Sequence, residues 1–176
     1  ADALVDLGAS VTTLNAQPDG CFPGRPSEPT AETLTALCGQ VGGSDADLGI
    51  AHDGDADRMM AVDETGRFVP KDVLLALFAR RAVADAGGGV VAAPVDTSQC
   101  VDDAIASAGG TVTRTKVGDV FVAEAATREE VVFGGEHSGA WIWPDETLCP
   151  DGPLAAVKLA ALVGAGGSPA AQVAGG

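Results

Sequence analysis

The sequence predicts an α/β protein made of two units, each a mixed sheet flanked by helices. Short apolar segments that favour strands alternate along the chain with longer segments of helical periodicity. Clusters of glycine and proline separate these segments. The pattern changes near residue 68, so we expect a first unit at 1–68, a second at 69–166 and a linker-like tail at 167–176.

The first unit is expected to contain helices and short strands around a breaker-rich segment. Residues 1–7 have the pattern of a helix end that stops at Gly8. Residues 15–29 hold too many glycines and prolines for regular structure, and a helix is expected from Thr30 until Gly42. The expected strands are 10–14, 48–52 and 59–62.

The second unit repeats a strand–helix–strand theme. Apolar side chains recur at helical spacing where helices are expected, and glycines follow them. The expected helices are 72–86, 98–108, 119–127 and 151–163, and the expected strands are 90–95, 111–115 and 131–133. Alternation of this kind favours a largely parallel or mixed sheet.

The composition narrows the function classes. A formal net charge of −15 argues against nucleic acid or an anionic membrane as the main partner. Hydrophobic residues make up 46% of the chain, which is enough for a packed core. The excess of 25 Asp and Glu over 10 Lys and Arg predicts a halophilic source, in which a high charge keeps proteins dissolved. An acidic protein from a mesophile with a GC-rich genome is the alternative.

The cysteines and the apolar segments favour a cytoplasmic protein. The 4 cysteines lie far apart and form no C-x-x-C pair, so we expect reduced thiols. No apolar run approaches the ~20 residues of a membrane span, and no signal-peptide pattern is present. Because the chain opens without Met in a helix-like segment, we expect it to begin inside a larger protein.

Residues 53–58, here called the Asp loop, carry three carboxylates between two apolar strands. Asp53, Asp55 and Asp57 are spaced so that a curled loop can turn them toward one point. Clustered negative charges repel, which makes the arrangement costly unless a cation neutralises it. Oxygen ligands select a hard ion, Mg²⁺ or Mn²⁺, and Arg58 adds a fork suited to phosphate. A solvated acidic turn is the alternative.

Two other sites that use aspartates in a loop fit less well. An EF-hand starting at Asp53 would need Gly where Arg58 stands and helices where strands are expected, so it is excluded. A haloacid-dehalogenase-type phosphatase would use Asp53 as its nucleophile and needs Thr or Val soon after the second Asp. Because Ala56 and Asp57 stand there, the phosphatase is a weak alternative.

Residues 134–139, here called the Glu loop, follow an apolar strand and carry the second candidate site. Glu136 and Ser138 are two residues apart, so an extended backbone points both side chains the same way. A carboxylate beside a hydroxyl suits two neighbouring sugar hydroxyls, and the flanking glycines permit close approach of a ligand. A glycine-rich turn with a helix-capping serine is the alternative.

The two loops together resemble those of the α-D-phosphohexomutase superfamily, which includes phosphoglucomutases, phosphomannomutases and phosphoglucosamine mutases. The Asp loop resembles the metal loop of this family, and the Glu loop resembles its sugar-recognition loop. Three further segments agree with the family in order and spacing, namely 22–29, 96–98 and 114–119. The resemblance covers nearly the whole chain and implies most of the second and nearly all of the third of four domains.

The resemblance also implies an isomerase that moves a phosphoryl group between O1 and O6 of a hexose phosphate by way of a phosphoserine. Asp53, Asp55 and Asp57 would then hold Mg²⁺ together with that phosphoserine, and Arg58 would stabilise the transferring phosphoryl group.

The resemblance assigns further roles to the second unit. Glu136, Ser138 and Gly118 would bind the substrate. Lys116 and Asp119 would lie near the reacting hydroxyl, where Asp119 is expected either to exchange protons or to cap a helix.

The resemblance implies, finally, that domain 1 with its serine and domain 4 with its phosphate loop lie outside this chain. The expected partners are therefore these domains and a mannose, glucose or glucosamine phosphate, and this chain alone is expected to be inactive. A non-catalytic module that binds a phosphosugar or Mg²⁺ is the alternative function, and the phosphatase is a weaker one.

Overall fold

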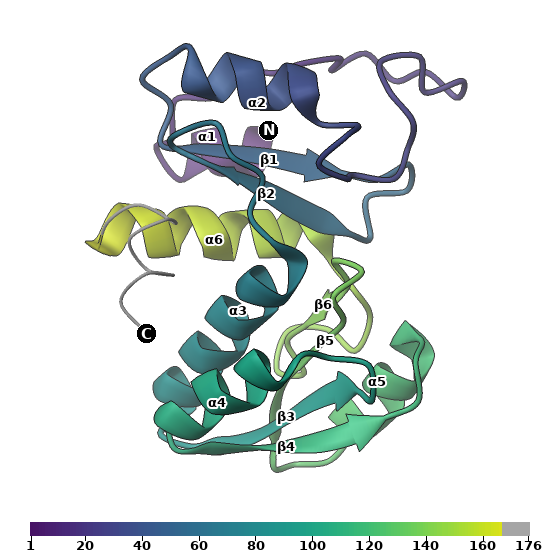
Figure 1. Ribbon diagram of the computed structural model, residues 1–176, viewed down its shortest axis with the longest axis vertical. Coiled ribbons are helices and arrows are strands. Elements are labelled where there is room, and N and C mark those ends of the chain that lie inside the picture. The colour runs from purple at the N-terminus through teal and green to yellow at the C-terminus, as the bar shows by residue number, and fades with distance from the viewer. Residues whose placement is uncertain (167–176) are drawn as a thin grey trace.

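The computed structural model describes residues 1–166, which form two sheets with helices on their faces (Figure 1). The helices are α1 (Asp2–Asp6), α2 (Thr35–Gly42), α3 (Lys71–Ala86), α4 (Gln99–Ser107), α5 (Asp119–Ala126) and α6 (Gly152–Gly166). The strands are β1 (Leu48–His52), β2 (Met59–Asp63), β3 (Gly89–Pro94), β4 (Gly110–Thr115), β5 (Val131–Gly135) and β6 (Trp141–Ile142). The predicted tail at 167–176 lies outside the described residues. Within residues 1–166, no helix is long and apolar enough to cross a lipid bilayer.

The first sheet is an antiparallel pair of strands that presents the Asp loop. Leu48 pairs with Asp63 and His52 with Met59, so the chain reverses direction through the Asp loop. α2 packs on one face of this pair and α6 on the other (Figure 1). Every residue of β2 is consequently buried. The strands that enter and leave the Asp loop are therefore held from both sides.

The second sheet has the strand order β4-β3-β5-β6. β4, β3 and β5 are parallel, and β6 runs antiparallel to β5. α3 and α4 pack against the face of β3 that holds Val91, whereas α5 packs against the face that holds Ala92. Because parallel strands end at the same edge of a sheet, segments 95–98 and 116–118 and the Glu loop lie at that edge.

One cluster of buried apolar side chains runs through both sheets. Met59 and Met60 of β2 belong to the same cluster as Phe78 of α3 and Trp141 of β6. The ring centroids of Phe78 and Trp141 lie 5.4 Å apart. Burial of apolar surface is the main favourable term in folding, so the two sheets stabilise one another. The boundary near residue 68 stays a prediction, because this core extends across it.

The structure confirms the predicted order of strands and helices and corrects it in places. Residues 10–14 do not form the expected strand; they are mostly exposed, and no described strand lies beside them to complete a ladder of hydrogen bonds. The helix expected from Thr30 begins only at α2. Thr33 Oγ1 accepts a hydrogen bond from Thr30 N–H (2.8 Å) and donates to Glu28 O (2.7 Å), which competes with helical pairing. The chain also forms β6, which the sequence did not predict.

Asp63 holds together the turn that follows β2. Its Oδ1 accepts hydrogen bonds from Thr65 N–H (2.9 Å), Thr65 Oγ1 (2.6 Å) and Arg67 N–H (3.0 Å). Burial tends to raise the pKa of Asp63, but these hydrogen bonds hold the pKa below its usual value. In the unfolded chain the pKa of an aspartate is ~3.9. The stability that Asp63 contributes is therefore fully present above that pH, and it is lost as the pH falls through the lower pKa of the folded state.

We expect Asp63→Asn to lower the free energy of unfolding by about 1–3 kcal/mol at neutral pH, because a neutral amide accepts these hydrogen bonds more weakly. Urea unfolding measures the difference between the two proteins, which should shrink once the pH falls below ~4. Asp45→Asn, at an exposed position, is the matched control and should leave the unfolding free energy unchanged. A difference that does not vary with pH would contradict the role of the charge.

Candidate functional site

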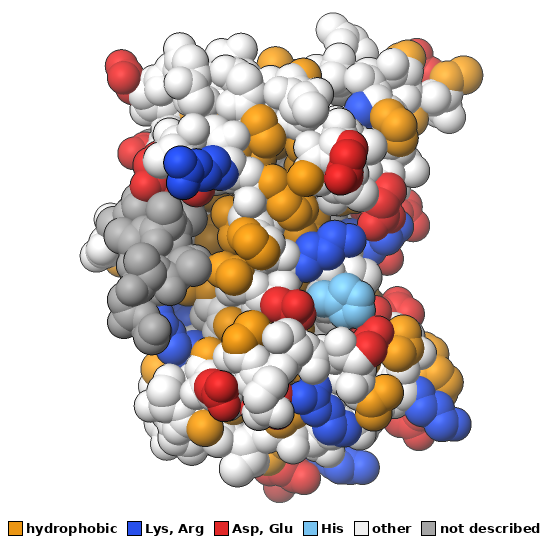
Figure 2. Space-filling model, viewed as in Figure 1, with side chains coloured by type: hydrophobic (Ala, Val, Ile, Leu, Met, Phe, Trp, Pro, Cys, Tyr) orange, Lys and Arg blue, Asp and Glu red, His pale blue; other side chains and the backbone are white. Residues whose placement is uncertain are grey.

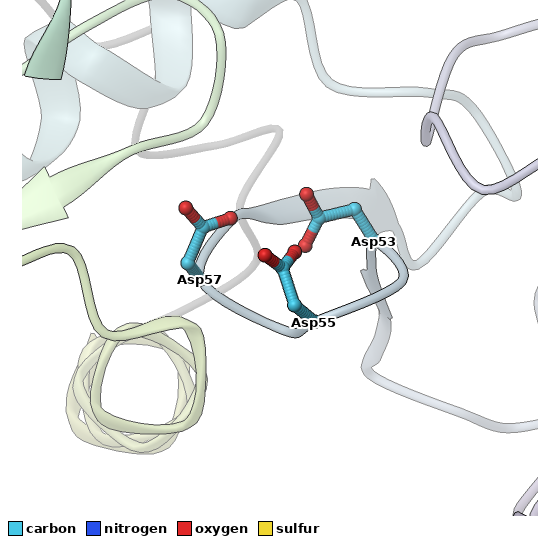
Figure 3. A group of neighbouring side chains, drawn as sticks. All are labelled: Asp53, Asp55 and Asp57. Carbon is cyan, nitrogen blue, oxygen red and sulfur yellow. The ribbon is translucent and has the colours of Figure 1, made fainter.

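The Asp loop brings its three carboxylates together (Figure 3). Asp53, Asp55 and Asp57 each offer one oxygen, and these oxygens all lie within 4.8 Å of one another. Asp53 is only 4% exposed, whereas Asp55 is open to solvent and Asp57 is partly buried. Ala56 adopts φ 62°, in the left-handed region, and this curls the backbone so that the carboxylates converge.

The carboxylates of the Asp loop are held in different electrostatic states. Burial tends to raise the pKa of Asp53, but the backbone N–H and the guanidinium of Arg58 lower it below its usual value. Burial raises the pKa of Asp57, and the negative charges of Asp53 and Asp55 raise it further. The loop therefore lowers the pKa of Asp53 and raises that of Asp57.

This set of ligands fits a divalent cation. Asp57 Oδ1 is buried without a hydrogen-bond partner in the described part of the chain, and Arg58 Nε lies 3.7 Å away from it. A buried carboxylate oxygen that lacks a hydrogen bond is costly. A hard cation between the three carboxylates would satisfy that oxygen and cancel their repulsion. Mg²⁺ at this position stays a prediction.

Arg58 closes the Asp loop and connects it to a distant segment. Its Nε lies 2.6 Å from Asp53 Oδ2, and its Nη1 lies 2.6 Å from Glu28 Oε2. Lys71 Nζ lies 3.8 Å from the other oxygen of Glu28. The guanidinium is therefore shared between two carboxylates. The sequence placed Glu28 in a family segment but gave no sign that it pairs with Arg58 or Lys71.

The segment around Arg25 packs on the strand that enters the Asp loop. The guanidinium of Arg25 donates to His52 O and lies 5.1 Å from the centre of the Phe22 ring. Burial lowers the pKa of His52, and its Nδ1 lies 3.2 Å from Arg58 O. The lowered pKa favours the neutral imidazole of His52, which lies against the backbone of the Asp loop at its expected place at the end of a strand.

The Glu loop and the loop after β4 meet at Glu136. Glu136 is 8% exposed, and its Oε1 accepts a hydrogen bond from the backbone N–H of Gly118 (2.6 Å). Its Oε2 accepts a hydrogen bond from Ser138 Oγ (3.2 Å). The structure thus brings together the three residues that the resemblance assigned to substrate binding. A carboxylate beside a hydroxyl and a backbone amide can bind neighbouring hydroxyl groups of a sugar.

Lys116 and Asp119 flank Gly118 but point to other partners. Lys116 Nζ lies 5.3 Å from the centre of the Phe121 ring. Asp119 stands in the first turn of α5, where its Oδ1 accepts a hydrogen bond from Val120 N–H (2.9 Å). Within residues 1–166, neither side chain pairs with the Asp loop or with Glu136. Their predicted catalytic roles stay predictions.

Two backbone regions join the Asp loop to the Glu loop. Met59 N–H, directly after the Asp loop, donates to Gly139 O (3.0 Å), and Arg58 forms an antiparallel bridge with Ala140. Trp141 Nε1 donates to Met59 O (3.0 Å). The two candidate sites are therefore neighbours in the fold, although they lie far apart in the sequence. On the face shown in Figure 2, acidic and basic side chains gather with a histidine between the upper and lower parts of the molecule.

The segment after β3 adds side chains that the sequence did not assign. Asp96 Oδ1 lies 4.0 Å from Nδ1 of His137 in the Glu loop, and Thr97 Oγ1 is buried without a hydrogen-bond partner in the described residues.

A groove of about 390 Å³ lies elsewhere, between α3 and α6, and residues such as Trp143 and Lys158 line it. None of the predicted site residues lines that groove.

Two consecutive parts of the chain match models of one protein family. Residues 2–66 match the family model described as "Phosphoglucomutase/phosphomannomutase, alpha/beta/alpha domain II", and residues 70–175 match the corresponding domain III. A protein of Methanopyrus kandleri named "Probable phosphoglucosamine mutase" is 50% identical over 170 residues, which are 97% of this chain and 38% of that protein. A protein of the same name from Methanosarcina acetivorans is 53% identical over 160 residues, which are 91% of this chain and 36% of that protein.

A solved structure gives the same result. The X-ray crystal structure of a phosphoglucomutase/phosphomannomutase family protein from Burkholderia thailandensis matches with a TM-score of 0.90 at 25% identity, over 99% of this chain and 38% of that one. This match confirms the predicted α/β fold. The chain spans 36–38% of the length of the two curated relatives described above. It therefore belongs to the phosphoglucomutase/phosphomannomutase family, as a portion that covers domains II and III of that family.

Proposed function

We propose that this chain is the metal-binding and sugar-binding portion of a Mg²⁺-dependent phosphohexomutase. The proposed reaction moves a phosphoryl group between O1 and O6 of a hexose phosphate, with the phosphoserine and the phosphate-clamping loop outside these residues. The observation that carries the proposal is the pairing of Met59 with Gly139, which sets three clustered carboxylates beside a carboxylate–hydroxyl pair.

The proposed substrate is glucosamine phosphate, with mannose or glucose phosphate as alternatives. The name shared by the two relatives described above supports the first of these, since they are 50% and 53% identical to this chain over 97% and 91% of its residues. Glu136, Ser138 and the amide of Gly118 would recognise the hydroxyl groups that these sugars share. Side chains of other domains would complete the choice between the sugars.

The proposed roles in the Asp loop follow from its charges. Asp53, Asp55 and Asp57 would hold Mg²⁺, which would supply positive charge to the oxygens of the transferring phosphoryl group. Arg58 is anchored to Asp53 through Nε, so a phosphoryl oxygen could replace Glu28 at its Nη1 without displacing the guanidinium. Lys116 and Asp119 would exchange protons with the reacting hydroxyl from the neighbouring loop.

The whole reaction can be tested on this chain and on a longer polypeptide in which domains 1 and 4 of the family flank it. A coupled assay that follows glucosamine-6-phosphate and glucosamine-1-phosphate should detect turnover only in the longer polypeptide and only with Mg²⁺. Sustained turnover by the 176-residue chain alone would contradict a phosphoserine outside it. Binding without turnover by the longer polypeptide would instead support a non-catalytic module.

We expect Asp55→Asn to weaken Mg²⁺ binding by roughly tenfold or more, because the affinity of such sites depends on the number of charged ligands. Asp55 is exposed and has no hydrogen bond among the described residues, so the fold should be unaffected. Isothermal titration of the chain with MgCl₂ measures the change. Asp47→Asn, an exposed carboxylate just before β1, is the matched control, and equal affinities for the two variants would contradict the metal site.

We expect Glu136→Gln to weaken binding of glucosamine-6-phosphate by roughly tenfold, because an amide accepts sugar hydroxyls more weakly than a carboxylate does. Titration calorimetry at saturating Mg²⁺ measures this affinity, and the Mg²⁺ affinity itself should stay constant. Glu129→Gln, in the exposed turn before β5, is the control. Unchanged sugar-phosphate affinity in Glu136→Gln would rule out the proposed role of the Glu loop.

A further inference from the structure

The contact between Trp141 and Met59 joins the Asp loop to the Glu loop through a buried side chain. Trp141 is 0% exposed, and its indole N–H donates to Met59 O at 3.0 Å. Met59 directly follows Arg58, whose guanidinium binds Asp53. A buried N–H or a buried carbonyl that is left without a partner destabilises the folded state. This hydrogen bond therefore holds the indole and the backbone together.

The other side of the contact is the backbone of the Glu loop. Met59 N–H donates to Gly139 O (3.0 Å), Gly139 N–H donates to Glu136 O (3.1 Å), and Glu136 N–H donates to Ala140 O (3.0 Å). The two peptide groups of Met59 are thus held by the Glu loop and by Trp141, one on each side. A shift of Met59 must therefore shift the backbone that carries Glu136.

Gly139 shows how closely the two loops approach each other. It adopts φ 103°, and a Cβ at this position would lie 3.1 Å from Met60 Sδ and 3.2 Å from Met59 O. Both values are tighter than ordinary van der Waals contact. The junction therefore has little room in which either loop could move alone.

We propose that Trp141 is a positioning residue through which a cation bound by the Asp loop orders the Glu loop. The inference rests on the proposed function for the cation and goes beyond it in coupling the two sites. With a cation bound, the three carboxylates would hold the Asp loop in one conformation, and this loop would keep Arg58 and Met59 in place. Met59 and Trp141 then fix Gly139, and with it the backbone on either side of Glu136. Cation binding should consequently raise the affinity for the sugar, and sugar binding should raise the affinity for the cation by the same factor.

Hydrogen exchange of the full 176-residue chain tests this coupling, with MgCl₂ alone as the probe. Peptides that contain the Asp loop and peptides that contain the Glu loop are followed with and without Mg²⁺. We expect Mg²⁺ to slow exchange in both loops, by about fivefold or more in the Glu loop, the lower end of common coupling between sites.

The variant Trp141→Phe keeps an aromatic ring in the core and removes the indole N–H. Mg²⁺ should still slow exchange in its Asp loop, whereas the slowing in its Glu loop should be clearly smaller than in the wild type, because only the backbone links between the loops remain. Trp143→Phe is the matched control. The ring centroids of Trp143 and Phe133 lie 5.1 Å apart, so Trp143 packs in the same group of aromatic rings, but it forms no hydrogen bond to Met59. Mg²⁺ should slow both loops of this control as in the wild type.

The control also supplies a spectroscopic signal. The chain has 2 tryptophans, so Trp143→Phe leaves Trp141 as the single emitter. Its fluorescence should change on addition of Mg²⁺ with the same midpoint as the calorimetric titration, because its indole is bonded to Met59. This signal and the wild-type exchange decide the proposal even if Trp141→Phe fails to fold.

The outcomes separate this inference from the proposed function. Slowing confined to the Asp loop in the wild type overturns the inference and leaves the metal site in place. Equal slowing of the Glu loop in Trp141→Phe and Trp143→Phe also overturns it. If Mg²⁺ slows exchange in neither loop, the proposed metal site and the inference fall together.

Discussion

The repulsion among three carboxylates in one short loop is the constraint on which the site depends. Their oxygens lie within 4.8 Å of one another, and burial together with neighbouring charge raises the pKa of Asp57. The guanidinium of Arg58 lowers the pKa of Asp53 and also binds Glu28, which Lys71 approaches at its other oxygen. Arg58 cannot neutralise all these carboxylates, so the loop retains a negative charge that favours a divalent cation.

Holding such a loop requires support from distant parts of the chain. α6 begins at Gly152, where a Cβ would lie 2.5 Å from Ala56 O and 2.7 Å from His52 Nδ1. Only glycine allows the helix to start so close beneath the Asp loop. α6 also packs against β1 and β2. A helix at the end of the described residues therefore supports the Asp loop of the first unit. The two units therefore share one framework.

The sequence predicted the parts of the site that are local. Asp53, Asp55 and Asp57 lie within five residues, and Glu136 and Ser138 are two apart, so spacing alone placed each set together. Contacts between distant residues, such as Arg58 with Glu28, leave no periodic pattern. The same limit explains the errors in the fold. A strand at 10–14 would need a neighbouring strand, which the alternation of polar and apolar residues cannot reveal. β6 has only 2 residues, too few to show such an alternation.

Two of the candidate binding groups, the carboxylate of Glu136 and the guanidinium of Arg58, already have hydrogen-bond partners among the described residues. Gly118 and Ser138 donate to Glu136, and Glu28 and Asp53 accept from Arg58. A ligand must therefore exchange these hydrogen bonds for its own, and the net gain of an exchange is smaller than that of a new bond. The exchange favours ligands that bring charge and several hydroxyl groups, because they replace several partners at once. A phosphorylated sugar has both properties, whereas a neutral sugar offers no negative charge to replace that of Glu28 at Arg58.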